Sequence, residues 1–328
     1  MAGKGSRLRP HTLTIPKPLV SVAGKPIVQR LVEDLAKAYH GKIEEVAYIV
    51  GQFGDAAERE LLRIAESIGA KGSIYYQDLP KGSAHALLCA KESMYGPCMI
   101  ALADTLFKAD FAFDPNEEAC IWVHKTDNPS AFGVVQLNEN QYIEAFVEKP
   151  SVFVSDLAMV GIYYIRDGEK YRDALQYVLD NDIKIKGEYQ LTSGLELLLQ
   201  QGTKFKTASI DEWLDCGNKE TVIYTNQRIL EHGNGNNLTD ESVILDNSVV
   251  IQPSFIGKNA IIKNSVIGPY VSIGENSIIE HSVISNSVIQ NDTVITDASL
   301  HDSMIGNFVE YQGRKTEISI GDYSKYSG

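Results

Sequence analysis

Between residues 25 and 104, apolar residues follow two spacings that alternate along the chain. Three stretches have apolar residues three and four positions apart, which predicts amphipathic helices: KPIVQRLVEDLAKAY, DAAERELLRIAESIG and SAHALLCAKESM. Each is followed by a short apolar run that predicts a strand: EEVAYIVG, GSIYYQ and CMIALAD. Because such alternation is typical of βαβ units, we predict an α/β domain with a Rossmann-like mixed, mainly parallel sheet and helices on both faces.

Beyond residue 242 the apolar residues recur every six positions instead. They are β-branched or aromatic: Val243, Val249, Phe255, Ile261, Ile267, Ile273 and Ile279. A second series occupies neighbouring positions: Ile244, Val250, Ile256 and Ile262. A period of six fits neither a helix nor a strand, but suits a prism of short parallel strands with three hexads in each coil. Ser285 breaks the phase, which resumes at Ile289 and Ile295, so we predict a hexapeptide-repeat β-helix of about four coils.

The two patterns divide the chain into two domains. A length of 328 residues suits two domains better than one. Between them lies HGNGNNLTDES, which is polar and rich in glycine and asparagine. We therefore predict a first domain over residues 1–231, a linker over 232–242 and a β-helix over 243–328.

The overall charge is acidic. The formal net charge is −13, from 43 acidic and 30 basic residues, which argues against nucleic acid or a membrane surface as a partner. No apolar run approaches the length that a transmembrane helix requires, and the N-terminus has no signal-peptide pattern. The four cysteines form no CxxC pair, as expected of thiols in a reducing compartment. These features predict a cytoplasmic protein.

The first 31 residues depart from this acidic background. They contain no Asp or Glu and carry six cations: Lys4, Arg7, Arg9, Lys17, Lys25 and Arg30. Gly3 and Gly5 are a glycine pair of the kind that lets backbone N–H groups approach a phosphate. The dinucleotide pattern GxGxxG fails because position 8 is leucine, and no GK[ST] follows at Walker spacing.

Prolines stiffen the same stretch. Pro10, Pro16 and Pro18 hold the chain in a non-helical path. Arg7 and Lys17 are then fixed beside the glycines, instead of moving freely in solvent. Rigid cations next to unpaired backbone N–H groups are suited to binding a triphosphate.

The segment GKGSRLRPHTLTIPKPLVSVAGKPIV resembles the signature of the sugar-1-phosphate nucleotidylyltransferases, and the similarity continues along the whole chain. In particular, the chain resembles the glucose-1-phosphate thymidylyltransferase-like enzymes that carry a C-terminal left-handed β-helix. The resemblance implies that an NTP and a sugar 1-phosphate lie across the sheet as partners. It also implies the reaction of that family, in which the sugar phosphate attacks the α-phosphorus and yields NDP-sugar and pyrophosphate, with Mg²⁺ as cofactor.

The resemblance also implies roles for individual residues. Arg7 would stabilise the departing pyrophosphate, and Lys17 would hold the phosphates near the reacting centre. Asp104, in MIALADT, and Asp215, in EWLDCGN, match the two metal-binding aspartates of the family. Two carboxylates at strand-to-loop junctions can bind the same hard cation. Phosphate oxygens then supply the remaining ligands of that cation.

Two further sets of residues match the substrate sites of the family. Nucleotide contacts are implied for Ala2, Gly3, Gly5, Gln77 and Gly82. Sugar-phosphate contacts are implied for Gly133, Glu148, Lys149, Lys186 and Glu188. An amide can pair with the donor and acceptor edge of a pyrimidine, so a glutamine at position 77 favours dTTP or UTP. The guanylyltransferase relatives tend to have glutamate there.

The sequence departs from the family in three respects and leaves other functions open. Lys186 stands where relatives often have arginine, and Ala103, before Asp104, stands where glycine is usual. The family has a core strand of about seven residues before the glycine loop, and this sequence lacks it. Either the true start lies upstream, which we favour, or the sheet lacks a strand beside its own active site. Alternative functions are a mannose-1-phosphate guanylyltransferase, a non-catalytic regulatory or assembly protein, and an additional acetyltransferase in the β-helix with His281 or His301 as base. We also expect the β-helix to build the interface of a homo-oligomer.

Overall fold

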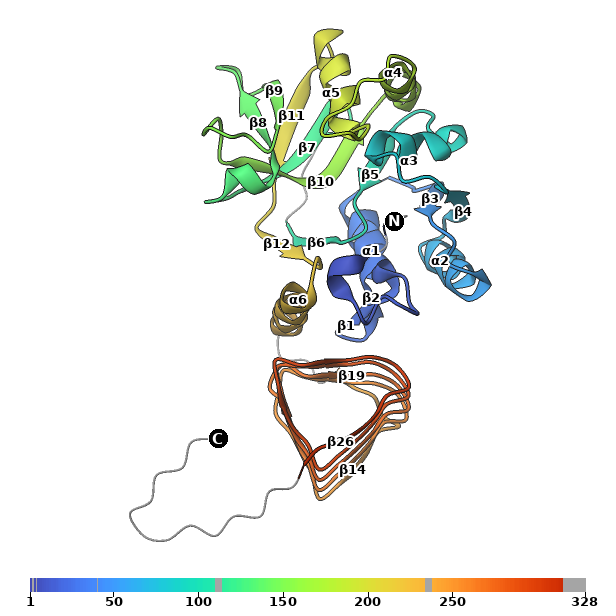
Figure 1. Ribbon diagram of the computed structural model, residues 1–328, viewed down its shortest axis with the longest axis vertical. Helices are drawn as coiled ribbons and strands as arrows, with labels where there is room; N and C mark the ends of the chain where they lie inside the picture. The colour runs from blue at the N-terminus through green and yellow to red at the C-terminus, as the bar shows by residue number, and fades with distance from the viewer. Residues whose placement is uncertain (2, 4, 40, 110–113, 234–237, 315–328) are drawn as a thin grey trace. The chain divides into compact units, whose positions relative to one another are not determined.

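The computed structural model describes residues 1, 3, 5–39, 41–109, 114–233 and 238–314 (Figure 1). Its contacts divide the chain into two compact units. The first comprises Met1–Val20 and Lys25–Thr221, and the second comprises Ser21–Gly24 and Val222–Gly328. In the described parts of the chain, no helix is long and apolar enough to cross a membrane.

The first unit alternates helices and strands as predicted. Its α-helices are α1 (Ile27–Ala38), α2 (Asp55–Ser67), α3 (Ser83–Cys89), α4 (Gly168–Asp180) and α5 (Leu191–Gln200). Short 3₁₀ helices cover Ser6–Leu8, Lys17–Leu19, Lys91–Ser93 and Pro129–Ala131. The strands are β2 (Lys25–Pro26), β3 (Glu45–Val50), β4 (Lys71–Tyr76), β5 (Cys98–Ala101), β6 (Thr105–Lys108), β7 (Ala119–Lys125), β8 (Gly133–Leu137), β9 (Ile143–Glu148), β10 (Leu157–Ile165), β11 (Phe205–Ser209) and β12 (Glu212–Asp215). The two-residue β1 (Ser21–Val22) belongs to the second unit.

The main sheet is mixed. Five strands follow in the order β11-β7-β10-β8-β9, and β5 also pairs with β10. Strands β5, β7 and β8 are all antiparallel to β10, and β11 is parallel to β7. Four of these strands therefore run in one direction, while β10 and β9 run in the other. The predicted mixed α/β fold is confirmed, with β10 between strands that are parallel to one another.

Two smaller sheets complete the first unit. Strands β3 and β4 form a parallel pair, and β6 and β12 form an antiparallel pair. Among the described strands, β3 pairs only with β4, and β5 only with β10. The second edge of each strand therefore has no partner strand within the described residues.

Apolar side chains of alternate positions build two cores in this unit. The larger packs β7 and β10 against α4 and α5, with Ile121, Tyr163 and Leu195 at most 4% exposed. The smaller packs α1 and α2 on β3, where Val50 and Leu61 are fully buried. The helices therefore bury their apolar faces on the sheets, and the strand ends are left for other roles.

The second unit consists of α6 and a prism of short parallel strands, which Figure 1 shows as a stack of triangular coils. The helix covers Lys219–His232. One sheet contains β13 (Leu238–Thr239), β16 (Phe255–Ile256), β19 (Ser272–Ile273), β22 (Val288–Ile289) and β25 (Met304–Ile305). The second contains β14 (Ile244–Asp246), β17 (Ile261–Lys263), β20 (Ile278–Glu280), β23 (Val294–Thr296) and β26 (Glu310–Gln312). The third contains β15 (Val249–Val250), β18 (Val266–Ile267), β21 (Val283–Ser285) and β24 (Ser299–His301).

The predicted β-helix is confirmed, but its repeat is not a uniform hexad. Phe255 pairs with Ser272 on the next coil, and Ser272 pairs with Val288 on the coil after that. Because both of these coils are shorter than three full hexads, the inward position shifts along the chain. The members of the first predicted series therefore do not all face the same way. Val249 is 56% exposed, whereas its neighbour Val250 packs against the core. From Ile267 onward, the residues of the first series point inward.

The predicted linker also contains regular structure. Helix α6 extends to His232, and Leu238–Thr239 forms β13, which pairs with β16 of the prism. The contacts group α6 from Val222 onward with the second unit. Residues 234–237 of the expected linker and 315–328 of the expected β-helix lie outside the described residues.

Candidate active site

The glycine loop is held by contacts with the residues that follow it. Gly5 has φ +58°, a left-handed conformation that favours glycine. Its carbonyl oxygen accepts hydrogen bonds from Leu8 N at 3.0 Å and Thr12 Oγ1 at 2.8 Å. A Cβ at Gly5 would lie 3.1 Å from the Cβ of Lys17, so the loop packs directly on this lysine. Leu8 is 1% exposed and anchors the turn, which leaves Arg7 on the exposed side.

Lys17 forms the central ion pair of the site. It begins the 3₁₀ helix Lys17–Leu19, directly after Pro16. Its Nζ lies 2.7 Å from Oδ2 of Asp104, and the two side chains are 10% and 37% exposed. A lysine so shielded holds its ammonium group in one place, and the half-exposed carboxylate is its counter-ion.

The two predicted metal ligands come from neighbouring strands. Asp104 directly precedes β6 and Asp215 ends β12, where Asp215 is paired with Thr105 across the antiparallel ladder. Cys216 N donates to the carbonyl oxygen of Asp104 at 3.0 Å. A Cβ at Gly217 would lie 2.6 Å from Oδ2 of Asp215, so glycine there leaves room for the carboxylate.

These two aspartates fit a magnesium ion only with help from a substrate. The described residues contain no group of three or more His, Cys, Asp or Glu side chains that could hold a metal ion. Mg²⁺ is often bound through one or two carboxylates together with substrate phosphates and water. Asp104 and Asp215 suit that arrangement, and Oδ2 of Asp104 is in contact with Nζ of Lys17.

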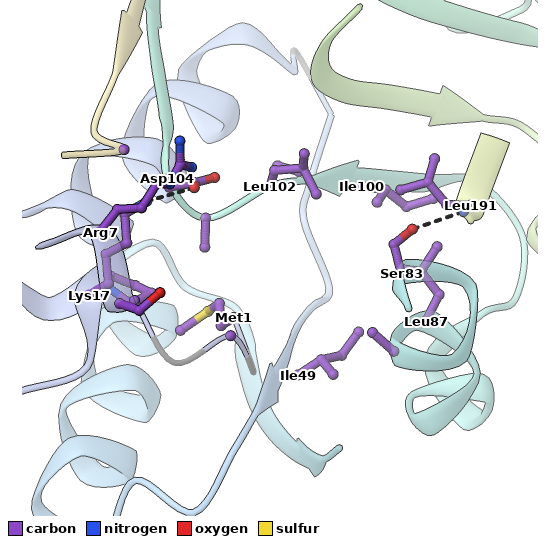
Figure 2. A pocket seen from close by; sticks show the side chains of 18 residues that line it. Met1, Arg7, Lys17, Ile49, Ser83, Leu87, Ile100, Leu102, Asp104 and Leu191 are labelled. Atoms are coloured by element: carbon purple, nitrogen blue, oxygen red, sulfur yellow. Dashed lines mark hydrogen bonds and ion pairs between the residues drawn. The ribbon is translucent and has the colours of Figure 1, made fainter. Parts of the chain in front are cut away.

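A pocket of about 350 Å³ lies beside this ion pair. Its polar side contains Gly3, Gly5, Ser6, Arg7, Lys17, Asp104 and Gly217. Its apolar side contains Ile49, Ala86, Leu87, Ile100, Leu102 and Leu191. Figure 2 shows Arg7, Lys17 and Asp104 together on one side, and Ile49 of β3 and Ile100 of β5 pointing into the pocket from separate strands.

Of the predicted base-recognition segment, Ser83 lines this pocket, whereas Gln77 and Gly82 are outside its lining. Gln77 follows β4, and its Nε2 lies 3.0 Å from the carbonyl oxygen of Gly82 and 3.1 Å from Nδ1 of His85. Gly82 has φ +116°, and a Cβ there would lie 2.4 Å from the carbonyl oxygen of Tyr189. The glycine at position 82 is therefore required by backbone packing, whatever its contact with a nucleotide.

Tyr189 and its neighbours join this segment to α5. Tyr189 N donates to Lys81 O at 3.0 Å, and Ala84 N donates to Tyr189 O at 2.9 Å. Leu191 N donates to Ser83 Oγ at 2.9 Å, a bond that Figure 2 also shows. Nothing in the spacing of the sequence indicates these long-range backbone contacts, so sequence reasoning missed Tyr189.

The predicted sugar-phosphate residues form two groups. Gly133 and Glu148 are partners across β8 and β9, and a Cβ at Gly133 would lie 2.8 Å from Oε2 of Glu148. Lys149 follows with φ +49° and an exposed side chain. Lys186 and Glu188, both exposed, lie in the turn closed by the bridge between Ile185 and Glu188.

Two histidines in this region have lowered pKa values. Burial lowers the pKa of His11, and the positive charge of Lys219 lowers it further. Burial also lowers the pKa of His85, with a second contribution from Lys81. Both shifts favour the neutral form of the ring. Of the other predicted residues, Ala2 lies outside the described residues.

Comparison with known proteins identifies the family of this site. A model of the nucleotidyl transferase family matches residues 1–232, which include the glycine loop, Lys17, Asp104 and Asp215. The chain belongs to the nucleotidyl transferase family. This nucleotidyl transferase is 30% identical over 301 residues to the low-salt glycan biosynthesis nucleotidyltransferase Agl11 of Haloferax volcanii, a match that covers 84% of this chain and 81% of Agl11.

Two further similarities agree with this assignment. The nucleotidyl transferase is 29% identical over 298 residues to a glucose-1-phosphate thymidylyltransferase of Streptomyces antibioticus, which covers 84% of this chain and 81% of that protein. A solved structure described as a glucose-1-phosphate thymidylyltransferase from Bacillus anthracis, with sucrose bound, superimposes with a TM-score of 0.57 at 24% identity. That match covers 69% of this chain and 91% of the other, and supports the fold.

Proposed function

We propose that this nucleotidyl transferase condenses an NTP with a sugar 1-phosphate to give NDP-sugar and pyrophosphate. The observation that carries the proposal is the polar side of the pocket, where the glycine loop, Arg7 and the Lys17–Asp104 pair lie together. Cations fixed beside a loop of backbone N–H groups are suited to a polyphosphate. The 29% identity to a thymidylyltransferase that acts on glucose 1-phosphate, by its name, agrees with this reaction.

The reaction is one displacement at phosphorus. An oxygen of the sugar phosphate forms a bond to the α-phosphorus, and the bond from that phosphorus to the bridging oxygen of the β-phosphate breaks. Pyrophosphate leaves with the electron pair of that bond. Such transfers depend mainly on positioning and charge neutralisation. Lys17 holds phosphate oxygens near the reacting phosphorus, and Arg7, on the exposed side, stabilises the leaving pyrophosphate.

Asp104 and Asp215 would hold the magnesium ion in this scheme. A bound Mg²⁺ would neutralise charge on phosphate oxygens as the new bond forms. Glu148, next to Gly133, accepts hydrogen bonds from sugar hydroxyls, while Lys149 and Lys186 attract the sugar phosphate. Lys186 keeps the charge of an arginine but lacks its two-pronged hydrogen bonding.

We propose dTTP or UTP as the nucleotide and glucose 1-phosphate as the sugar. Gln77 supports a pyrimidine with a ring N–H, because an amide oxygen accepts from that group.

The two histidines considered for acetyl transfer offer less support for a second activity. His281 and His301 have side chains 58% and 67% exposed on the outer surface of the β-helix.

The reaction is tested by measuring pyrophosphate release with Mg²⁺, each NTP and a panel of sugar 1-phosphates. We expect release with dTTP or UTP and glucose 1-phosphate, and a fall of at least about 100-fold in Asp215→Asn, the size seen when one charge-stabilising group is lost. Asp211→Asn is the matched control, since Asp211 is an exposed residue just before β12. No release with any pair would refute the proposed reaction, and full activity in Asp215→Asn would refute its metal-binding role.

We also propose that the β-helix joins copies of the chain into a homo-oligomer. Val249, Val266 and Val283 lie in register on successive coils and are 56%, 37% and 54% exposed. An ordered apolar column on a flat sheet is typical of a contact surface, and an identical column on a second copy is complementary to it.

This interface is tested with Val266→Glu on a sizing column. The charge lies in the middle of the column of valines, so we expect the apparent mass to fall to that of one chain. Thr296→Glu, on another face of the prism, is the control and should elute like the unmodified protein. If Val266→Glu elutes unchanged while the protein is oligomeric, the valine column is not the interface.

A further inference from the structure

The side-chain amide of Gln77 is held by two acceptors from the protein itself. Its backbone N–H donates to Val50 O at 2.8 Å, which fixes the residue beside the end of β3. Its Nε2 lies 3.0 Å from Gly82 O and 3.1 Å from His85 Nδ1. A carboxamide nitrogen has two hydrogens to donate and accepts none. Both hydrogens are therefore engaged, and Oε1 is the atom of this amide that can meet a ligand.

This arrangement determines the protonation of His85. Because Nε2 of Gln77 can only donate, Nδ1 of His85 carries no proton, and the neutral ring has its hydrogen on Nε2. Burial and the nearby charge of Lys81 both lower the pKa of His85, which favours the neutral form. Helix α3 begins directly after Gly82 and carries His85 in its first turn, so the start of this helix supplies both acceptors.

We propose that His85 is a positioning residue that sets nucleotide specificity, by holding the amide of Gln77 with its oxygen toward the base. Uracil and thymine donate N3–H to such an oxygen. Cytosine has an unprotonated N3, whose lone pair would face the lone pairs of Oε1. The inference rests on the proposed function, in which Gln77 meets the base of the NTP. It also explains how an amide discriminates uracil and thymine from cytosine, although a freely rotating amide could present its N–H donor to the base instead.

Two substitutions of His85 distinguish the effect of its acceptor atom, Nδ1, from the effect of the size of its ring. In histidine, Nδ1 is bonded to Cγ, and the Oδ1 of asparagine is bonded to Cγ in the same way. His85→Asn therefore keeps an acceptor close to the position of Nδ1. His85→Leu puts a methyl group there and leaves one hydrogen of Gln77 Nε2 without its partner.

The experiment compares UTP with CTP in the full-length protein. For each variant we measure kcat/KM for pyrophosphate release with both nucleotides, and the Kd of each nucleotide by calorimetry. We expect the preference for UTP to fall about tenfold in His85→Leu, the effect of one hydrogen bond, and to be retained in His85→Asn. His124→Leu is the control, because His124 is a half-buried histidine of β7 whose Nδ1 lies 3.4 Å from Ile210 O.

The possible results are distinct. Equal preference in His85→Leu and the unmodified protein would overturn the inference, and so would equal loss in the leucine and asparagine variants, which would indicate a role of the ring itself. A protein that binds UTP and CTP equally would also overturn it. If no pyrophosphate is released but the Kd ratio falls in His85→Leu alone, the inference stands and the proposed reaction fails.

Discussion

Lys17→Met is expected to lower kcat for pyrophosphate release by about 100- to 1,000-fold, the range observed when one preorganised charge-stabilising group is removed. Lys17 is suited to so large an effect because its side chain is only 10% exposed and lies at the pocket beside the glycine loop. Methionine keeps an unbranched apolar chain of similar length, so the packing of Gly5 on this side chain is preserved.

The matched control is Lys25→Met. Lys25 belongs to the same cationic N-terminal segment, but its Nζ lies 2.7 Å from Glu33 and outside the pocket lining. We expect this variant to keep nearly full activity. Thermal unfolding of both variants separates catalysis from folding, since loss of Lys17 also leaves Asp104 without its ion-pair partner. If Lys17→Met retains activity near that of Lys25→Met, Lys17 has no catalytic role.

The second large effect concerns the apolar side of the pocket. Adding about six apolar, β-branched residues before Met1 is expected to raise the midpoint of thermal unfolding, because they can fill the apolar space between β3 and β5. Ile49 and Ile100 point into this space from strands that have no second partner among the described residues. Each apolar side chain that becomes fully buried there contributes about 1.5–3 kcal/mol.

An extension of equal length with alternating lysine and proline is the control. It cannot fill an apolar slot or pair with both strand edges, so the unfolding midpoint should not rise. Equal unfolding midpoints for the two extensions would contradict the proposal.

The fold could be predicted largely because its apolar spacing is local information. The helical spacing of residues 25–39 and 55–69 predicts α1 and α2, and the apolar run 44–51 predicts β3. Strand direction is different, because it depends on which strands become neighbours. The antiparallel β10, placed between β5 and β7, could not be read from the alternation of helices and strands.

The candidate site was predictable where a motif carries its own geometry. The glycine loop and Lys17 are close in sequence, and the structure brings them into contact. Asp104 and Asp215 are distant in sequence, and only the pairing of β6 with β12 makes them neighbours. For Gln77 the residue type alone was misleading. A glutamine amide could both donate to a base and accept from it, but Gly82 and His85 engage both hydrogens of this amide.

The coils of the β-helix differ in length at one corner, and this has a consequence for how such a domain can change. The corner between β18 and β19 contains Gly268 and Pro269, whereas the next one, between β21 and β22, is shorter and turns through Asn286 with φ +40°. Asn286 N donates to Pro269 O at 2.9 Å, so the short corner still stacks on the long one. The inward residues Ile273 and Ile289 remain in register above each other. A single insertion or deletion at this corner is therefore absorbed locally, whereas the same change inside a strand would turn every following side chain to the wrong face.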